Sequence, residues 1–139
     1  MKNIEWTARI AWGEARNQGP EGLQAVVNVI DNRARMDLFN DGKPDWWGES
    51  HAGVATKPYQ FSAYNANDPN RAKLEAVTDA DPLFAHAVEL AAMAVAGSLP
   101  DITDGATHYH AAHIPAPHWT VGAERTGIIG DHIFYKGVA

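Results

Sequence analysis

The sequence contains no cysteine. That absence excludes a disulfide scaffold, a cysteine nucleophile and a metal site built on thiolates. Long apolar runs are missing as well. The longest candidate, residues 83–99, is interrupted by His86 and Glu89 and falls short of the roughly 18 apolar residues that a membrane span needs. We therefore expect no transmembrane segment.

Positive charge is scarce in this chain. The 17 Asp and Glu residues outnumber the 11 Lys and Arg residues, which gives a formal net charge of −6. This sign is wrong for neutralising phosphates, so we expect no nucleic-acid partner. The remaining composition is ordinary, with 45% hydrophobic residues, and a length of 139 residues suits one domain with its own core. We predict a single catalytic domain spanning residues 1–139.

Apolar residues at helical spacing predict three helices, over residues 4–16, 20–36 and 82–96. Gly19 can end the first helix in a left-handed conformation, and Pro20 can begin the second. Asp81 is a good N-cap for the third helix. Because its alanines permit close packing, we expect this third helix to be the central one, with an inward face formed by Leu83, Phe84, Ala87, Val88, Ala91, Ala92 and Val95.

The rest of the chain is less regular. Residues 39–81 lack sustained periodicity, and we expect only short helical turns there, at residues 60–65 and 70–77. After Pro100, residues 106–110 and 131–136 have the β-branched and aromatic composition of strands. The predicted fold class is α+β, mainly helical, with a small antiparallel β-sheet in the C-terminal third.

Glu14 is the sharpest candidate for chemistry. It falls at the margin of the apolar stripe of the first helix, so its carboxyl group should be half desolvated. In such a place, beside Trp6 and Trp12, a carboxylic acid can stay protonated near neutral pH and donate a proton. Taken alone, the pattern favours a solvated surface glutamate, because most glutamates on helices are solvated.

Four blocks in a fixed order give the sequence a resemblance to a known family. They are Trp12-Gly13-Glu14-Ala15-Arg16, then Tyr59-Gln60-Phe61-Ser62 with Tyr64-Asn65, then Gly105-Ala106-Thr107-His108-Tyr109, and finally Ile129-Gly130-Asp131-His132 with Phe134-Tyr135. Together they resemble the cell-wall hydrolases of the spore cortex-lytic enzyme (SleB and CwlJ) type. The resemblance implies a lysozyme-like domain that acts on bacterial peptidoglycan, with Glu14 as the catalytic acid and no cofactor.

The mechanism of glycosidic cleavage depends on how many carboxylates take part. A glycoside hydrolase generally needs a second one, whereas a lytic transglycosylase needs only a single glutamate that acts as acid and then as base. No spacing selects a partner among Asp31, Asp101, Asp104 and Asp131. We therefore favour transglycosylation at the bond between MurNAc and GlcNAc, and muramidase-type hydrolysis stays open.

Aromatic and uncharged polar side chains outside the regular helices are candidates for sugar binding. Aromatic faces stack on sugar rings, and amides and hydroxyls bind their polar groups. The residues that we expect to contact the glycan are Trp47, Gln60, Phe61, Ser62, Tyr64, Thr107, His108 and Tyr109. Trp46, Tyr59, Asn65 and Trp119 are further candidates of the same kinds.

Seven histidines raise the alternative of a zinc-dependent amidase or peptidase acting on peptide stems. His108 and His110 would share one face of a strand, as paired ligands must, with His113 and His118 nearby. No metalloprotease signature accompanies them, so we predict no metal and expect His108 and His132 to be hydrogen-bonding supports near the cleft. A third alternative is a non-catalytic wall-binding or virion module.

Charged residues near the N-terminus, including Lys2 and Glu5, interrupt any apolar segment, so we expect no signal peptide in this chain. Together with the resemblance, this suggests an endolysin-like protein. Such a protein accumulates in the host cytoplasm until its release to the cell wall, or is associated with the virion.

Overall fold

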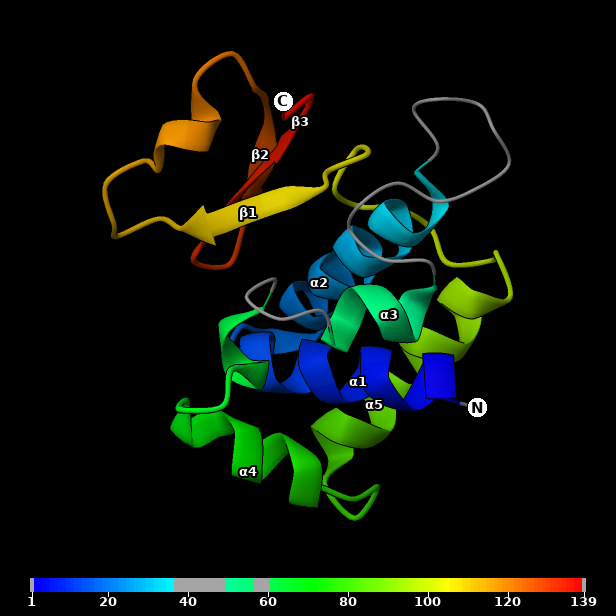
Figure 1. The fold of residues 1–139 in the computed structure, drawn as a ribbon. Helices are drawn as coiled ribbons and strands as arrows, with labels where there is room; N and C mark the ends of the chain where they lie inside the picture. The colour runs from blue at the N-terminus through cyan, green and yellow to red at the C-terminus, as the bar shows by residue number, and fades with distance from the viewer. Residues whose placement is uncertain (1, 37–49, 57–60, 139) are drawn as a thin grey trace.

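The computed structural model describes residues 2–36, 50–56 and 61–138. Helices occupy the first two thirds and an antiparallel sheet follows, so the predicted α+β class is confirmed (Figure 1). The helices are α1 (Lys2–Ala15), α2 (Gly19–Arg35), α3 (His51–Thr56), α4 (Pro69–Ala76) and α5 (Pro82–Val95), with short 3₁₀ helices η1 (Ser62–Tyr64) and η2 (His118–Thr120). The strands are β1 (His108–Ala111), β2 (Glu124–Ile129) and β3 (His132–Lys136).

The central helix is α1, which packs against α2, α3, α4 and α5. The expectation that the helix of residues 82–96 would be central is therefore wrong, although its boundaries are close to those predicted. Its buried face is also rotated from the predicted one, because Leu90 and Ala94 are buried while Leu83, Val88, Ala92 and Val95 are half-buried. Alanine content indicates close packing but does not identify which helix is surrounded.

The helix boundaries follow local chemistry that the sequence already carries. Gly19 has a φ of 78°, a conformation that suits glycine, and it turns the chain from α1 into α2. Asp81 caps α5 by accepting hydrogen bonds from the backbone N–H groups of Leu83 and Phe84. The predicted turns near residues 60–65 and 70–77 are η1 and α4.

The sheet has the strand order β1-β3-β2, with both pairs antiparallel. Strands β1 and β3 confirm the two predicted strands. Strand β2 was not predicted because it is an edge strand with exposed Glu124 and Arg125 and a register irregularity before Gly127. Helix α3 was also not predicted, because six residues are too few to show a helical period.

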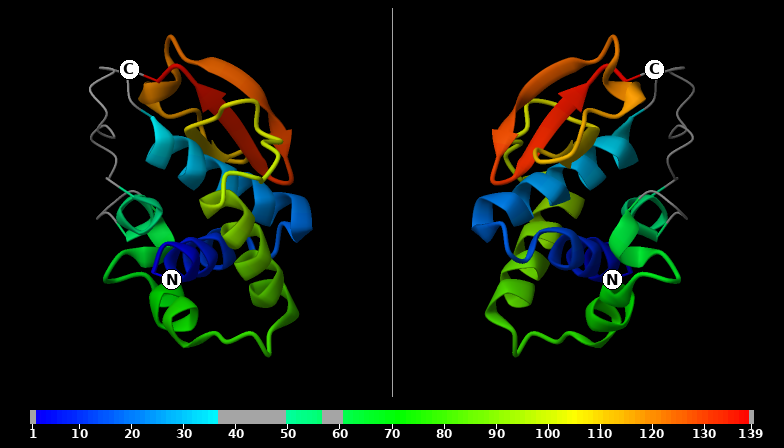
Figure 2. Two further views of the ribbon diagram at one scale, coloured as in Figure 1. Left: turned by 90° about the vertical axis from the view of Figure 1, so that its right-hand side faces the viewer. Right: turned by 90° about the vertical axis from the view of Figure 1, so that its left-hand side faces the viewer.

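The sheet lies beside α2 (Figure 2), and polar side chains of α2 bond to the segment that leads into the sheet. The side chain of Asn28, which is almost fully buried, donates to the carbonyl of Pro100 at 3.1 Å and accepts from the N–H of Ile102 at 3.1 Å. One turn later, Asn32 Nδ2 donates to the carbonyl of Ala106 at 2.8 Å. These bonds fix the segment that leads into β1 and therefore fix where β1 places its side chains.

Within the described residues, no helix is long and apolar enough to cross a membrane.

We predict that Asp81→Ala lowers the free energy of unfolding by about 1 kcal/mol, because it removes the N-cap of α5. Urea unfolding followed by circular dichroism measures this change. Asp79→Ala removes an equal charge from an exposed position in the same connection and should change stability by less than about 0.5 kcal/mol. Equal losses in the two variants would contradict the capping role.

Candidate active site

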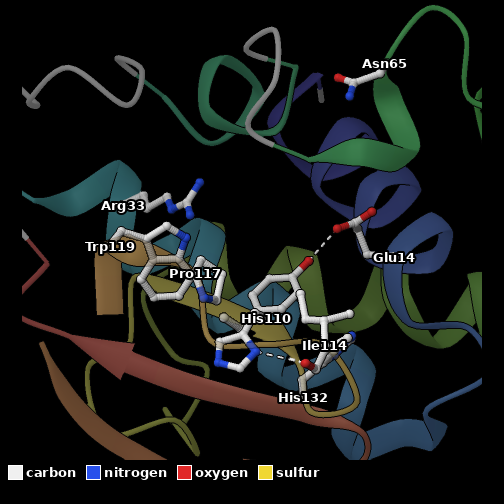
Figure 3. A pocket seen from close by; sticks show the side chains of 10 residues that line it. Glu14, Arg33, Asn65, His110, Ile114, Pro117, Trp119 and His132 are labelled. Atoms are coloured by element: carbon white, nitrogen blue, oxygen red, sulfur yellow. Dashed lines mark hydrogen bonds between the residues drawn. The ribbon is translucent and has the colours of Figure 1, made fainter. Parts of the chain in front are cut away.

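The carboxyl group of Glu14 is held by hydrogen bonds from two distant segments, and Figure 3 shows one of these bonds. Its Oε1 accepts from the hydroxyl of Tyr109 on β1 at 2.5 Å, and its Oε2 accepts from the backbone N–H of Ala63 in η1 at 3.0 Å. Glu14 is half-buried near the end of α1, as its place at the margin of the apolar stripe predicts. Both carboxyl oxygens therefore have fixed positions.

Gly13 explains how η1 comes so close to Glu14. A Cβ atom at this position would lie 3.1 Å from Cβ of Ala63 and 2.9 Å from Cδ2 of Leu74. The missing side chain leaves room for the segment whose backbone N–H reaches the carboxyl group. The glycine and the glutamate of the Trp-Gly-Glu-Ala-Arg block thus serve the same contact.

Two cavities adjoin Glu14. The larger, which we call the main pocket, has a volume of about 410 Å³ and lies between α1, α2 and the C-terminal third of the chain (Figure 3). Its lining consists of Glu14, Arg33, Asn65, Tyr109, His110, Ala111, Ile114, Pro117, Trp119 and His132. The smaller, which we call the polar cleft, has a volume of about 220 Å³ and is lined by Gly13, Glu14, Arg16, Asn17 and Asn70.

Tyr109 is suited to act as a permanent hydrogen-bond donor. Burial raises its pKa well above the usual 10.0, and the charge of Glu14 and the hydrogen bond to it raise it further, while Arg33 opposes them. The phenol therefore keeps its proton at any physiological pH. Its ring packs against His132, at a centroid distance of 4.8 Å, and against Phe134, at 5.4 Å.

Arg33 brings a buried positive charge to the main pocket. Its side chain is 6% exposed, its Nε donates to the carbonyl of Thr107 at 2.6 Å, and its guanidinium lies over the ring of Phe61. Burial lowers its pKa to about 10, while Tyr109 and Glu14 act to raise it. Arg33 therefore stays charged at neutral pH.

Two histidines of the sheet, His108 and His132, are neutral near pH 7 because their pKa values are lowered. Burial, and then the charge of Arg33, lower the pKa of His108 to about 4. Burial is also the main reason why the pKa of His132 is lowered, with Asp131 opposing it and His110 adding to it. His110 is engaged at both ring nitrogens, by the carbonyl of Ala111 and by the hydroxyl of Tyr135.

The structure separates the predicted substrate contacts into groups. Tyr109 lines the main pocket, as do the further candidates Asn65 and Trp119. Phe61 and Thr107 are almost fully buried, at 2% and 3% exposure, so they support the pocket from behind. Trp47, Gln60 and the side chain of Ser62 lie outside the described part of the chain, as do Trp46 and Tyr59.

Two other predicted residues, Tyr64 and His108, do not line the main pocket. Tyr64 packs against Trp6 and beneath the guanidinium of Arg71. His108 is half-buried beside Trp119 and makes its expected hydrogen bond, to Thr107 Oγ1 at 2.9 Å. His132 does line the pocket, and its ring contacts that of Tyr109 at a tilt of 47°. Its Nδ1 is buried with no hydrogen-bond partner in the described residues, so the expected hydrogen bond is not seen at this nitrogen.

Sequence reasoning missed Arg33 as a pocket residue. The sequence does hold a signal for it, because Arg33 follows Val26 and Ile30 on the buried face of the helix. An arginine is rarely buried unless its charge has a specific partner. Ile114 and Pro117 were also missed. They lie in an irregular segment with no pattern that indicates which side faces a ligand.

The candidate second carboxylates have other roles. Asp31 accepts from Arg35 and contacts His51, each at 2.7 Å. Asp104 pairs with Lys136, and Asp131 Oδ2 accepts from Gln18. Asp101 organises the loop before β1; burial acts to raise its pKa, but hydrogen bonds led by those from Thr103 lower it overall. In the described residues, Glu14 is the only carboxylic acid that lines either cavity.

No group of three histidine, aspartate or glutamate side chains in the described ranges 2–36, 50–56 and 61–138 is placed to hold a metal ion.

The chain belongs to the Cell Wall Hydrolase family, whose model matches residues 17–135, and it is therefore an enzyme that acts on peptidoglycan. Glu14 lies just before the matched range, so its role rests on the geometry above. Among curated protein sequences, none matches this chain.

Two solved structures share the fold. The catalytic domain of the SleB protein of Bacillus cereus is 24% identical, with a TM-score of 0.70 over 97% of this chain and 90% of that chain. The catalytic domain of the germination-specific lytic transglycosylase SleB from Bacillus anthracis is also 24% identical, with a TM-score of 0.65 over 98% of this chain and 95% of that chain. The lysozyme-like α+β expectation agrees with this family fold.

We predict that Tyr109→Phe lowers kcat on peptidoglycan by about 10- to 100-fold, because one carboxyl oxygen of Glu14 loses its donor while the ring packing is kept. Release of soluble fragments from purified sacculi measures the rate. Tyr135→Phe removes the other buried tyrosine hydroxyl of the sheet, which bonds to His110, and should retain most of the activity. Full activity of Tyr109→Phe would contradict this role.

We predict that stability falls as the pH is lowered from 6.5 towards 4, in part because of His108. The unfolded chain binds a proton at the ordinary pKa of 6.5, whereas the folded protein resists it until about 4, so acid favours unfolding within this window. Urea midpoints across the window should fall less in His108→Asn than in the parent. The exposed His113→Asn serves as the control, and an unchanged pH dependence in His108→Asn would contradict the assignment.

Proposed function

We propose that the protein is a lytic transglycosylase that cleaves the β-1,4 bond between MurNAc and GlcNAc, with Glu14 as the catalytic acid and base. One observation carries the proposal. A single carboxyl group, fixed by Tyr109 and Ala63, lines both cavities, and no second carboxylic acid of the described residues lines either one. The family assignment supports the substrate class.

In the first step, the protonated carboxyl of Glu14 donates its proton to the glycosidic oxygen. The bond from that oxygen to C1 of the muramyl sugar breaks, and its electron pair stays on the leaving GlcNAc oxygen. In the second step, the Glu14 carboxylate takes the proton of the muramyl C6 hydroxyl, whose oxygen attacks C1 and closes a 1,6-anhydro ring. Glu14 ends protonated, and no water is consumed.

The fixed carboxyl suits both steps. The Tyr109 hydroxyl and the Ala63 N–H stabilise the carboxylate that exists between the two proton transfers. Both donors belong to the protein and stay in place during the reaction. The Glu14 carboxylate that has released its proton is therefore already oriented to accept the proton of the C6 hydroxyl. Two carboxylates would be needed for hydrolysis by the usual route.

We propose that the sugars lie against the aromatic side of the main pocket. The rings of Tyr109, Trp119 and His132 present faces on which sugar rings can stack, and Asn65 provides an amide for hydroxyl or N-acetyl groups. The other two hypotheses, a zinc amidase and a non-catalytic wall-binding module, are favoured by no observation on the described residues. The endolysin-like setting that the sequence motifs imply stays a prediction.

We predict that Glu14→Gln lowers the rate of peptidoglycan cleavage by about 100-fold or more, because an amide cannot deliver or collect the proton. Mass spectrometry of the fragments released by the parent should show 1,6-anhydro-muramyl ends. Glu21→Gln, on the first turn of α2, is the matched control and should keep the parental rate.

The other outcomes identify the alternatives. New reducing ends from the parent would indicate hydrolysis, and cut peptide stems that disappear with EDTA and return with zinc would indicate an amidase. An unchanged rate in Glu14→Gln would overturn the proposal.

A further inference from the structure

We infer that the polar cleft is a recognition site for a carboxylate of the peptide branch of peptidoglycan, and that Arg16 binds it. The inference rests on the proposed function and adds a substrate preference to it. An enzyme with this site should cleave strands that carry anionic peptides faster than strands whose peptides are neutral.

The guanidinium of Arg16 is held in place beside the catalytic group. Its Nη2 donates to Oδ1 of Asn70 on α4 at 2.7 Å, and its Nη1 donates to the carbonyl of Gly13 at 3.3 Å. Its central carbon lies 4.5 Å from the ring centre of Trp12, so the planar group stacks on the indole. The side chain is half-buried and lines the same cavity as Glu14.

The chemistry of the cleft suits a carboxylate. A guanidinium carries five N–H donors in a planar fork, and the two bonds above use two of them. Asn70 accepts from Arg16 through its amide oxygen, so its amide nitrogen is a further donor on the same wall, and Asn17 adds a second amide. Bidentate binding of a carboxylate is what an oriented arginine does best.

The reaction places such a carboxylate within reach. The muramyl sugar supplies the anomeric carbon, so it must lie directly beside Glu14, and its C3 lactyl group carries the peptide. The branch then leaves through one of the cavities that adjoin Glu14. Aromatic rings of Tyr109, Trp119 and His132 wall the main pocket, where Asn65 provides one amide and the cation Arg33 is 6% exposed and bonded to the carbonyl of Thr107. The polar cleft instead offers the half-buried guanidinium of Arg16 and two amides. The cleft is the better match for a peptide with free carboxylates.

The negative net charge of the chain makes a local cation important for binding an anionic substrate. With a formal net charge of −6, the protein as a whole repels an anionic polymer. A fixed guanidinium two residues from Glu14 supplies local attraction for the branch in the polar cleft. This arrangement favours productive binding without a basic surface elsewhere.

The test compares soluble peptide-bearing glycan fragments with the same fragments after their carboxylates have been converted to neutral methylamides. For the parent, we expect kcat/KM to fall by about tenfold on the neutral substrate, mainly through a higher KM, since a charged hydrogen-bonded contact is lost. Arg16→Gln should show the lower value on both substrates. Arg16→Lys, which keeps the charge but loses the planar fork, should retain part of the preference.

Lys73→Gln is the matched control, because it removes an equal charge from an exposed position on α4 and should keep the parental preference. Equal rates of the parent on the two substrates would overturn the inference, whatever the variants do. An equal loss in Arg16→Gln on both substrates, with the preference intact, would show a structural role only and would also overturn it. Products without 1,6-anhydro ends would instead contradict the proposed reaction, so the two failures are distinguishable.

Discussion

The hydrogen bonds to the Glu14 carboxyl join three parts of the chain that are far apart in sequence. Glu14 comes from the central helix α1, Ala63 from the short helix η1, and Tyr109 from the first strand of the sheet. The separations of 49 and 95 residues mean that no local segment can form the site alone. The geometry of this carboxyl group therefore depends on the packing of the whole domain, to which Gly13 and Asn28 contribute through the contacts described above.

Burial around this carboxyl group controls which groups carry charge. Tyr109 keeps its proton because ionising it in the interior, next to a carboxylate, would be costly, and His108 stays neutral at pH 7 for a related reason. Arg33 keeps its charge and is tied to the backbone of Thr107. The result is a pocket with fixed donors around one carboxyl group, which is the arrangement that the proposed single-glutamate mechanism requires.

Much of this arrangement could be predicted from the sequence, because it depends on interactions between residues that are close together in the chain. The stripe of α1 places Glu14 at the margin of the core, and Asp81 and Gly19 mark helix boundaries by side-chain and backbone chemistry. Tertiary packing was harder to predict. The alanine content of α5 wrongly indicated that it is the central helix, a place that α1 takes. The edge strand β2 lacks the alternation of apolar and polar residues that predicts a strand, because its first residues are exposed and charged.

The pocket lining was only partly predictable for the same reason. Tyr109 was identified from its motif, whereas Phe61 and Thr107 from neighbouring motifs proved to be buried supports. A motif marks residues that matter to a site, but only packing decides which of them face the ligand. Arg33 shows the converse, because it reaches the pocket from a helix whose periodicity indicates a core face.

If one carboxyl group completes the proposed reaction, no water enters the product. Digestion of purified sacculi in water enriched in heavy oxygen, followed by mass spectrometry of the released fragments, tests this. We expect 1,6-anhydro ends that contain none of the heavy isotope, because the ring-closing oxygen is the sugar's own. Reducing ends that carry one heavy oxygen atom for each cleavage would contradict it.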